Sequence, residues 1–299
     1  MINKFFKSLA KKAQKKYHIS MENQVKTCQE ICEESIRKKF HSSIFSKFAK
    51  AINQYEMLEE GDKVAVCISG GKDSMLMAKL FQELKRHNKF EFSLEFIVMD
   101  PGYNKKNREL IEQNATKLGV PIKIFETDIF ENVVNIEKSP CYLCARMRRG
   151  HLYNFAKNLG CNKIALGHHY DDVIETIVMG MLYGGQIQTM MPKLKSTNFE
   201  GMELIRPLYL VREKDIIAWK NYNQLEFLQC ACKFTDENYR EDKESASKRK
   251  SVKKLIAQLS KEDKQIEANI FKSVENVNLC TIVAYKDKNQ VKHHFLDEY

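Results

Sequence analysis

The chain has 299 residues, of which 43% are hydrophobic and 29% are charged, so its composition excludes an intrinsically disordered protein. No stretch approaches the ~20 apolar residues of a membrane-spanning helix, and the first residues lack the apolar segment of a secretory signal. We therefore expect a globular cytoplasmic protein without a membrane partner, and its nine cysteines are expected as reduced thiols, metal ligands or catalytic groups.

The amino-terminal residues are strongly basic. The formal net charge is +10, and six lysines among the first twenty residues supply more than half of it. Residues 1–22 are therefore expected to form a basic extension, which either touches an anionic surface such as nucleic acid or is simply solvated. Residues 23–58 have apolar side chains at helical spacing and predict a helical segment. Within it, Cys28 and Cys32 are interpreted as structural, with a zinc-ligand role as the weaker alternative.

Short apolar segments then alternate with stretches of helical period, within a core domain expected at residues 59–235. The predicted strands are residues 63–69, 93–100, 121–127 and 163–167, and the predicted helices are residues 72–87, 105–118, 146–159 and 173–183. Gly119 and Gly160 are expected to end two of these helices. This alternation predicts an α/β, Rossmann-like fold with a parallel sheet, in which ligands bind at the carboxyl ends of the strands.

The pattern is less regular after residue 185. Residues 204–211 predict a strand whose pairing Pro207 limits, and residues 212–224 predict a helix. A charged loop and a helical carboxyl-terminal segment are expected at residues 236–299. In that segment, a mobile loop is expected within residues 236–254, a helix at residues 255–277 and an edge strand in the last twenty residues.

The sequence Ser-Gly-Gly-Lys-Asp-Ser, residues 69–74, directly follows the apolar residues 64–68 of the first predicted strand. It lacks the spacing of a Walker A motif. Gly70 and Gly71 permit a sharp turn, and the amides after them open a helix whose positive end can bind phosphate. The loop also offers two hydroxyl donors, a cation and a carboxylate for Mg²⁺, at Ser69, Ser74, Lys72 and Asp73. The alternative is an ordinary glycine-rich turn in which Asp73 and Ser74 cap the helix.

Cys141 and Cys144 form a C-x-x-C pair immediately before the helix predicted at residues 146–159. The helix dipole and nearby arginines lower the pKa of thiols at such a place. Because one pair supplies only two metal ligands, the next candidates are Cys230 and Cys232. Three cysteines can hold a 4Fe-4S cluster with one iron lacking a protein ligand. Four cysteines could instead close a zinc site, and a redox dithiol is the third alternative.

Two further groups of polar residues are candidates for the site. The histidines and aspartates of His-His-Tyr-Asp-Asp could bind a transition metal, or an aspartate caps the next helix; these are His168, His169, Asp171 and Asp172. Arginines suit phosphate because a guanidinium bonds two oxygens, and the candidates are Arg146, Arg148, Arg149 and, more weakly, Arg206 and Arg212. A solvated helix face is the alternative, which fits Arg149 best.

The glycine loop resembles the pyrophosphatase loop of the PP-loop ATP-pyrophosphatase superfamily, in which ATP is split into AMP and pyrophosphate. Together with the segments CYLCARMRRG, KIALGHHYDD and LIRPLYLVREKDI, it makes the region from Cys28 to Cys232 similar to the tRNA 2-thiocytidine synthetase family. The resemblance implies an ATP-dependent, iron-sulfur-dependent tRNA sulfurtransferase. Such an enzyme adenylates the C2 oxygen of a pyrimidine, with cytidine in the anticodon loop favoured, and replaces that oxygen with sulfur.

The resemblance also implies roles for single residues. ATP would contact the loop, Asp100, Gly167 and His168, and Mg²⁺ would be bound by Asp73 and Asp172. Arg148 and Asp172 would take part in the reaction. The cluster ligands and catalytic cysteines would be Cys141, Cys144 and Cys230, with Cys232 as the alternative third ligand because Cys-Ala-Cys replaces the family's Cys-x-x-Cys. The implied partners are tRNA, a second copy in a homodimer, and a sulfur donor, either a cysteine desulfurase or inorganic sulfide.

Other functions share parts of this pattern. A 2-thiouridine synthetase, or an enzyme that thiolates or desulfurates a small molecule, would use the same scaffold. Lysidine synthetase shares the loop but needs no cluster, so the C-x-x-C pair argues against it. A non-catalytic iron-sulfur sensor or RNA-binding module would have no need of a pyrophosphate loop.

Overall fold

The computed structural model of the chain describes residues 26–87, 89–129, 140–228 and 243–298. The side chains of residues 140–145, 243–247 and 298 lie outside that description, and so does the predicted basic extension.

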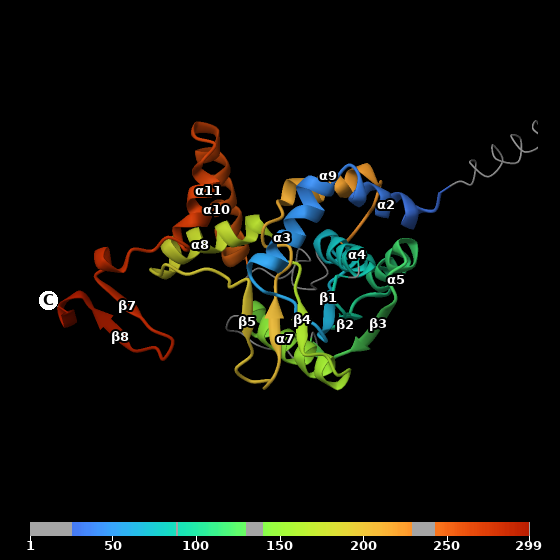
Figure 1. Ribbon diagram of the computed structural model, residues 1–299, viewed down its shortest axis with the longest axis horizontal. Coiled ribbons are helices and arrows are strands. Elements are labelled where there is room, and N and C mark those ends of the chain that lie inside the picture. The colour runs from blue at the N-terminus through green and yellow to red at the C-terminus, as the bar shows by residue number, and fades with distance from the viewer. Residues whose placement is uncertain (1–25, 88, 130–139, 229–242, 299) are drawn as a thin grey trace, which may run out of the picture.

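A six-stranded sheet forms the centre of the molecule (Figure 1). Its strand order is β3-β2-β1-β4-β6-β5, and all neighbours pair in parallel except β5, which runs antiparallel to β6. The strands are β1 (Lys63–Ile68), β2 (Ser93–Asp100), β3 (Ile122–Glu126), β4 (Lys163–Ala165), β5 (Lys193–Lys195) and β6 (Glu203–Ile205). The predicted α/β fold with a parallel sheet is confirmed.

Strand β1 lies between β2 and β4, and its side chains are buried because helices cover both faces of the sheet. Val64, Val66 and Ile68 belong to one core, whereas Ala65 and Cys67 belong to a second core across the sheet. This division follows from the two-residue period of a strand. A continuous apolar sequence is therefore what a central parallel strand requires.

Helices cover both faces of the sheet (Figure 1). They are α4 (Lys72–Arg86), α5 (Lys105–Leu118), α7 (Pro140–Asn158), α8 (Tyr170–Gly184) and α9 (Glu213–Tyr222). The predicted stop at Gly119 is confirmed, since its φ of 64° is left-handed. Helix α7 starts six residues earlier than predicted, at Pro140. Proline suits the first helical position. The C-x-x-C pair therefore lies inside α7 and not before it, with Cys141 in the first turn and Cys144 at the start of the second.

The predicted amino-terminal helical segment is present in two parts. Helix α2 (Cys28–Arg37) begins with a capping box between Thr27 and Glu30, and α3 (Ser46–Gln54) follows the π-helical turn η1 (His41–Phe45). Ile36, Ile44 and Phe48 are fully buried in the core shared with α4. Cys32 is also buried, and burial raises the pKa of its thiol to about 12, which fits the structural interpretation of this cysteine.

The carboxyl-terminal residues differ from their predictions. The expected helix at residues 255–277 is two helices, α10 (Lys243–Glu262) and α11 (Ile266–Ser273), so residues 243–254 of the stretch expected to hold a loop are helical. The strand predicted at residues 204–211 ends at Ile205, because Pro207 has no amide hydrogen to extend the ladder. The last residues form a separate hairpin of β7 (Ala284–Lys286) and β8 (Lys292–His294), and not an edge strand of the main sheet.

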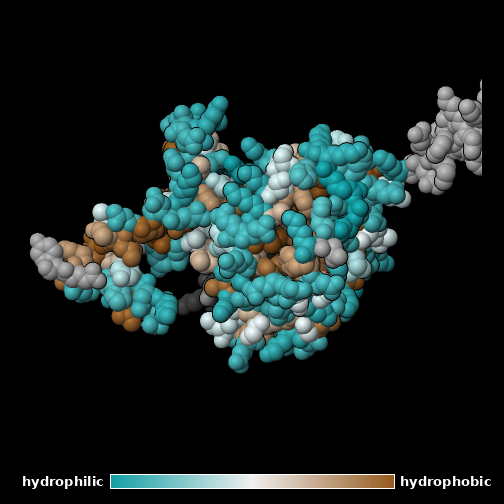
Figure 2. Space-filling model, viewed as in Figure 1, coloured by the Kyte–Doolittle hydropathy of each residue, from teal (hydrophilic) through white to brown (hydrophobic). Residues whose placement is uncertain are grey.

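Helices α10 and α11 pack on α8. The rings of Tyr170 and Phe271 stack 4.4 Å apart, and Val252 and Ile256 of α10 are buried. The hairpin instead projects from the body and shows a surface rich in apolar residues (Figure 2). No helix in the described ranges is both long and apolar enough to cross a bilayer.

Candidate functional site

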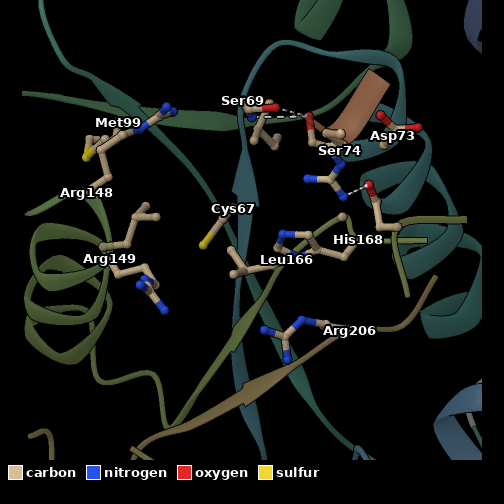
Figure 3. Close-up of a pocket in the computed structure, with 15 residues that line it drawn as sticks. Cys67, Ser69, Asp73, Ser74, Met99, Arg148, Arg149, Leu166, His168 and Arg206 are labelled. Carbon is tan, nitrogen blue, oxygen red and sulfur yellow. Dashed lines mark hydrogen bonds and ion pairs between the residues drawn. The ribbon is translucent and has the colours of Figure 1, made fainter. Parts of the chain in front are cut away.

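A cavity of about 550 Å³ opens where β1, β2, β4 and β6 end (Figure 3). This is the edge of the sheet at which the topology predicts a ligand, and the volume is typical of small-molecule sites. It is lined by Cys67, Ile68, Ser69, Asp73, Ser74, Met99, Arg148, Arg149, Leu152, Leu166, Gly167, His168, Asp172, Arg206 and Arg249.

The glycine loop forms one wall of this cavity. Gly70 has a φ of +81°, and a Cβ atom there would lie 2.7 Å from Ile111 Cγ1, so the turn requires glycine. The Ser74 hydroxyl accepts from the Ser69 amide at 3.1 Å and donates to the Gly71 carbonyl at 3.0 Å. Gly71 is the N-cap of α4 and no side chain caps the helix, so the predicted alternative of capping by Asp73 or Ser74 is not what forms.

Lys72 and Asp73 are held in a chain of ion pairs. The Lys72 ammonium lies 3.1 Å from Asp73 Oδ2 and 3.3 Å from Glu213 Oε1. Lys253 of α10 pairs with the same Glu213. Asp73 lines the cavity, and its Oδ1 is buried without a hydrogen-bond partner among the described residues. Lys72 is not part of the lining.

The end of β4 packs against the glycine loop. A Cβ atom on Gly167 would lie 3.2 Å from the Ser74 amide nitrogen, so glycine permits this close approach. His169 caps α8: its Nδ1 accepts from the Asp172 amide at 3.3 Å, while the Asp172 carboxylate accepts from the His169 amide at 3.0 Å. Within the described ranges, no three His, Cys, Asp or Glu side chains are arranged to hold a metal ion.

His168 and Arg206 line the cavity together. Burial, followed by the nearby positive charge of Arg206, lowers the pKa of His168 to about 4, so its imidazole is neutral at pH 7. Burial also lowers the pKa of Arg206 to about 10. Arg206 donates to the Met191 carbonyl. Neither His168 Nδ1 nor Arg206 Nε has a hydrogen-bond partner in the described part of the chain.

The two adjacent aspartates have different surroundings. Asp172 lines the cavity and accepts from Arg249 Nη2 at 2.9 Å. Asp171 does not line it; it accepts from the Glu213 amide at 2.6 Å at the start of α9 and pairs with Arg212 at 3.0 Å. Arg212 is therefore engaged in holding α8 to α9 and is likewise outside the cavity lining.

Asp100 ends β2 as a turn former. Its carboxylate accepts from the amides of Gly102 and Tyr103 at 2.9 and 2.7 Å and pairs with Arg108 at 2.7 Å. Although burial opposes the shift, these hydrogen bonds keep the pKa of Asp100 below its usual value. Asp100 is not part of the cavity lining, which Met99 reaches instead.

Helix α7 forms the wall that faces the glycine loop. Arg148 and Arg149 extend from it into the cavity region (Figure 3), whereas Arg146 is exposed and outside the lining. Residue 144 precedes Arg148 by four positions, the spacing that places two positions on one face of a helix. The backbone at residue 144 thus lies one turn before the lining residue Arg148, and that at residue 141 about two turns before it, while Cys230 and Cys232 lie outside the described residues.

Sequence reasoning missed several lining residues. Met99, Leu152 and Leu166 carry no chemical signature, and Cys67 lies within the first predicted strand, where its position gave no indication of a site. Burial raises the pKa of the Cys67 thiol, which keeps it neutral. Arg249 lies in the charged stretch that was expected to include a loop, so it was not considered as a site residue. The helical spacing of the apolar residues that follow it, Val252 and Ile256, is the signal that could have placed it on a helix.

Comparisons with known proteins show which sequences and folds this chain is similar to. A sequence profile described as the PP-loop domain matches residues 40–242. The tRNA-cytidine(32) 2-sulfurtransferase of Neisseria meningitidis serogroup C is 39% identical over 211 residues, which cover 69% of this chain and 64% of that protein. The protein of the same name from Alcanivorax borkumensis is 36% identical over 245 residues, covering 80% of this chain and 82% of that protein. The match thus spans less than two thirds of the length of the Neisseria relative.

Among solved structures, the U34-tRNA thiolase NcsA from Methanococcus maripaludis, with its 4Fe-4S cluster, has a TM-score of 0.60 and 21% identity. The match covers 77% of this chain and 76% of that one, and it shows a shared fold. The resemblance stated from the sequence is confirmed: the chain belongs to the PP-loop family, in the group of proteins named tRNA-cytidine(32) 2-sulfurtransferase.

Proposed function

We propose that this protein is an ATP-dependent tRNA sulfurtransferase that requires an iron-sulfur cluster. The C2 oxygen of a cytidine in the anticodon loop attacks the α-phosphorus of ATP, and pyrophosphate leaves. Sulfide then attacks C2, and AMP leaves with the original oxygen. The activation is needed because a carbonyl oxygen is a poor leaving group, whereas a phosphate ester is a good one.

One observation carries this proposal: the glycine loop and the arginines of α7 line the same cavity. The first supplies donors for pyrophosphate, and the second supplies guanidinium groups for the phosphate that joins the base. Three lining residues also present buried polar atoms that make no hydrogen bond in the described part of the chain, namely Asp73 Oδ1, His168 Nδ1 and Arg206 Nε. A polar ligand would satisfy these atoms, and leaving them unpaired is costly.

The phosphates of ATP are expected to bind at the start of α4. There the uncapped amides and the partial positive charge of the helix end meet the Ser69 and Ser74 hydroxyls. Lys72 lies within this region, but its ammonium pairs with Asp73 and Glu213. Its positive charge would therefore attract the phosphates from a distance and not by direct contact. Arg148, across the cavity, would neutralise charge that develops on the transferred phosphate.

Asp172 and His168 would act on the base. Asp172 is an anionic acceptor beside the cavity, suited to the exocyclic amine of cytosine or to Mg²⁺. The neutral imidazole of His168 can donate or accept a hydrogen bond without adding charge. Water exclusion by Leu152, Leu166 and Met99 would strengthen these interactions.

The described residues offer some of the ligands that Mg²⁺ and an iron-sulfur cluster would need. Mg²⁺ would find Asp73 Oδ1, which accepts no hydrogen bond from the described residues, and the Asp172 carboxylate, oxygens of the kind it prefers. The C-x-x-C pair lies at the positive end of α7, which favours thiolates. A 4Fe-4S cluster on Cys141, Cys144 and Cys230, or Cys232, would supply an iron site for sulfur. A cysteine desulfurase or inorganic sulfide is the proposed source of that sulfur.

The test is a reconstituted reaction. The anaerobically purified protein is given iron and sulfide, then ATP, Mg²⁺ and an unmodified tRNA transcript, and the nucleosides are analysed by mass spectrometry. We expect 2-thiocytidine together with a matching amount of AMP. The Cys144→Ala variant should lose both iron and product, while Cys280→Ala, a change of an exposed cysteine of the carboxyl-terminal segment, should keep them.

Other products would contradict specific parts of the proposal. Formation of 2-thiouridine would overturn the choice of base, and ATP turnover that needs a small molecule but no tRNA would overturn the substrate class. Iron binding without any ATP cleavage would identify a sensor in place of an enzyme.

A further inference from the structure

We propose that helix α10 forms an RNA-binding surface beside the cavity, which holds an unpaired loop of the substrate while its target base enters. We call this surface, made of Lys248, Lys250, Lys254 and Tyr183, the α10 surface. The inference rests on the proposed function for the identity of its RNA, because the cavity must accept a base that has left its stack.

The charge of α10 is unusually one-sided. Between Glu244 and Glu262 the helix has six basic residues and no acidic one. Lys250 and Lys254 are exposed, one turn apart, and make no ion pair with any described residue. Like charges at this spacing repel and destabilise a helix. A bound polyanion would remove that repulsion.

The same helix reaches the cavity. Arg249 lines it and pairs with Asp172 at 2.9 Å and Glu175 at 2.8 Å, while Lys253 pairs with Glu213. The charges of Arg249 and Lys253 are thus neutralised by carboxylates of α8 and α9. At 100° per residue, Lys250 and Lys254 lie on the flank next to them, so the uncompensated charge lies beside the cavity mouth.

An aromatic side chain lies on the other flank. The Lys248 ammonium is 5.6 Å from the centre of the Tyr183 ring, at the end of α8, and Tyr183 is 50% exposed. Aromatic rings next to cations are the pattern with which proteins bind single-stranded nucleic acids, because bases stack on the rings and phosphates meet the cations. A helix is only about 10–12 Å across, so an RNA loop can contact both flanks.

The arrangement of the helices fits this role. Helix α10 stands over α8 and extends outward from the body, and its surface is mostly hydrophilic (Figures 1 and 2). It lies beyond residue 242, where the PP-loop profile ends, so the nucleotide site and the α10 surface come from different parts of the chain. A division of this kind lets one segment bind ATP and the other present the RNA.

The test measures RNA binding separately from thiolation. An unmodified, fluorescently labelled tRNA transcript is titrated with the full-length protein, without ATP or sulfide, at several salt concentrations. We expect the Lys250→Gln/Lys254→Gln double variant to raise Kd on the order of tenfold and to reduce the slope of log Kd against log salt by about 1.5. Tyr183→Ala should raise Kd about tenfold with an unchanged salt slope, and Tyr183→Phe should bind like the wild type.

A matched control removes the same charge elsewhere. Lys85 and Lys117 are exposed in the last turns of α4 and α5, on the side of the molecule away from α10 (Figure 1), and Lys85→Gln/Lys117→Gln should leave Kd within twofold of wild type. Equal losses for both double variants, or no loss for the α10 variant, would overturn the inference. Binding to vesicles of phosphatidylserine and phosphatidylcholine is measured in parallel. The inference would also be overturned if the α10 double variant lost binding to these vesicles but kept its Kd for the tRNA. If the α10 variants lose RNA binding but the wild type makes no thiolated nucleoside, the proposed function fails and the surface stands.

Discussion

Arg249 and Asp172 meet across 77 positions of sequence, with Arg249 Nη2 2.9 Å from Asp172 Oδ1. Arg249 Nε simultaneously donates to Glu175 at 2.8 Å, so one guanidinium holds two carboxylates of α8. The pair closes one side of the cavity with a helix from outside the PP-loop profile. Its two partners are one turn apart, which suits the fork of an arginine and not the single point charge of a lysine.

Replacing Arg249 should therefore affect both stability and turnover. In Arg249→Gln, the largely buried Glu175 loses its ion pair, and we expect the free energy of unfolding to fall by about 1–2 kcal/mol. We also expect kcat for thiolation to fall about tenfold or more, because Asp172 is no longer oriented. Arg249→Lys should recover part of the stability and less of kcat. Denaturant titration and single-turnover assays measure the two effects, and Lys38→Gln, at an exposed surface pair, is the control.

Gly70 and Gly160 provide a comparison of two left-handed glycines. Both have positive φ, at 81° and 74°, but a Cβ on Gly70 would clash with Ile111 and Leu228, whereas one on Gly160 would meet no atom within 4 Å. We expect Gly160→Ala to cost about 1 kcal/mol of stability and to keep ATP binding. Gly70→Ala should cost about 2–4 kcal/mol and abolish ATP binding at millimolar ATP. Calorimetric titration of ATP distinguishes them, and equal effects of the two substitutions would contradict the packing argument.

Asp171 and Asp172 should separate stability from chemistry. Asp171→Asn removes charge from the bonds that join α8 to α9, so we expect a loss of about 1–2 kcal/mol of unfolding free energy. Asp172→Asn should cost less stability but lower kcat/KM more strongly, about a hundredfold, because its carboxylate lines the cavity. Assays well below the melting temperature of both variants give the comparison. A larger catalytic defect in Asp171→Asn would reverse the assignment.

His168 should make stability depend on pH in the acid range. Its pKa falls from an ordinary 6.5 to about 4 in the folded protein, so between these values the unfolded chain binds more protons. The free energy of unfolding therefore rises with pH across this window, and the stability that the neutral His168 contributes is lost as the pH falls from 6.5 toward 4. We expect His168→Gln to reduce that slope by up to ~1.4 kcal/mol per pH unit, the contribution of a single proton. NMR titration of the ring should show the low pKa directly.

Sequence alone predicted the parts of this protein that depend on neighbouring residues. The strand and helix alternation, the glycine turn and the C-x-x-C spacing are local patterns, because backbone period and glycine conformation are encoded within a few positions. The parallel sheet follows from the alternation, and the parallel sheet brings the ends of β1 and β4 to one edge. The edge of the sheet at which the cavity opens was thus predictable before any contact was known.

Tertiary structure decided which of the candidate side chains lie in that site. Asp171 and Asp172 are adjacent in sequence, yet only Asp172 lines the cavity, because successive helical positions point about 100° apart and α9 occupies the side of Asp171. Asp100 likewise satisfies its own turn. Arg249 enters only because α10 packs across α8, a contact between distant helices whose crossing no local pattern specifies.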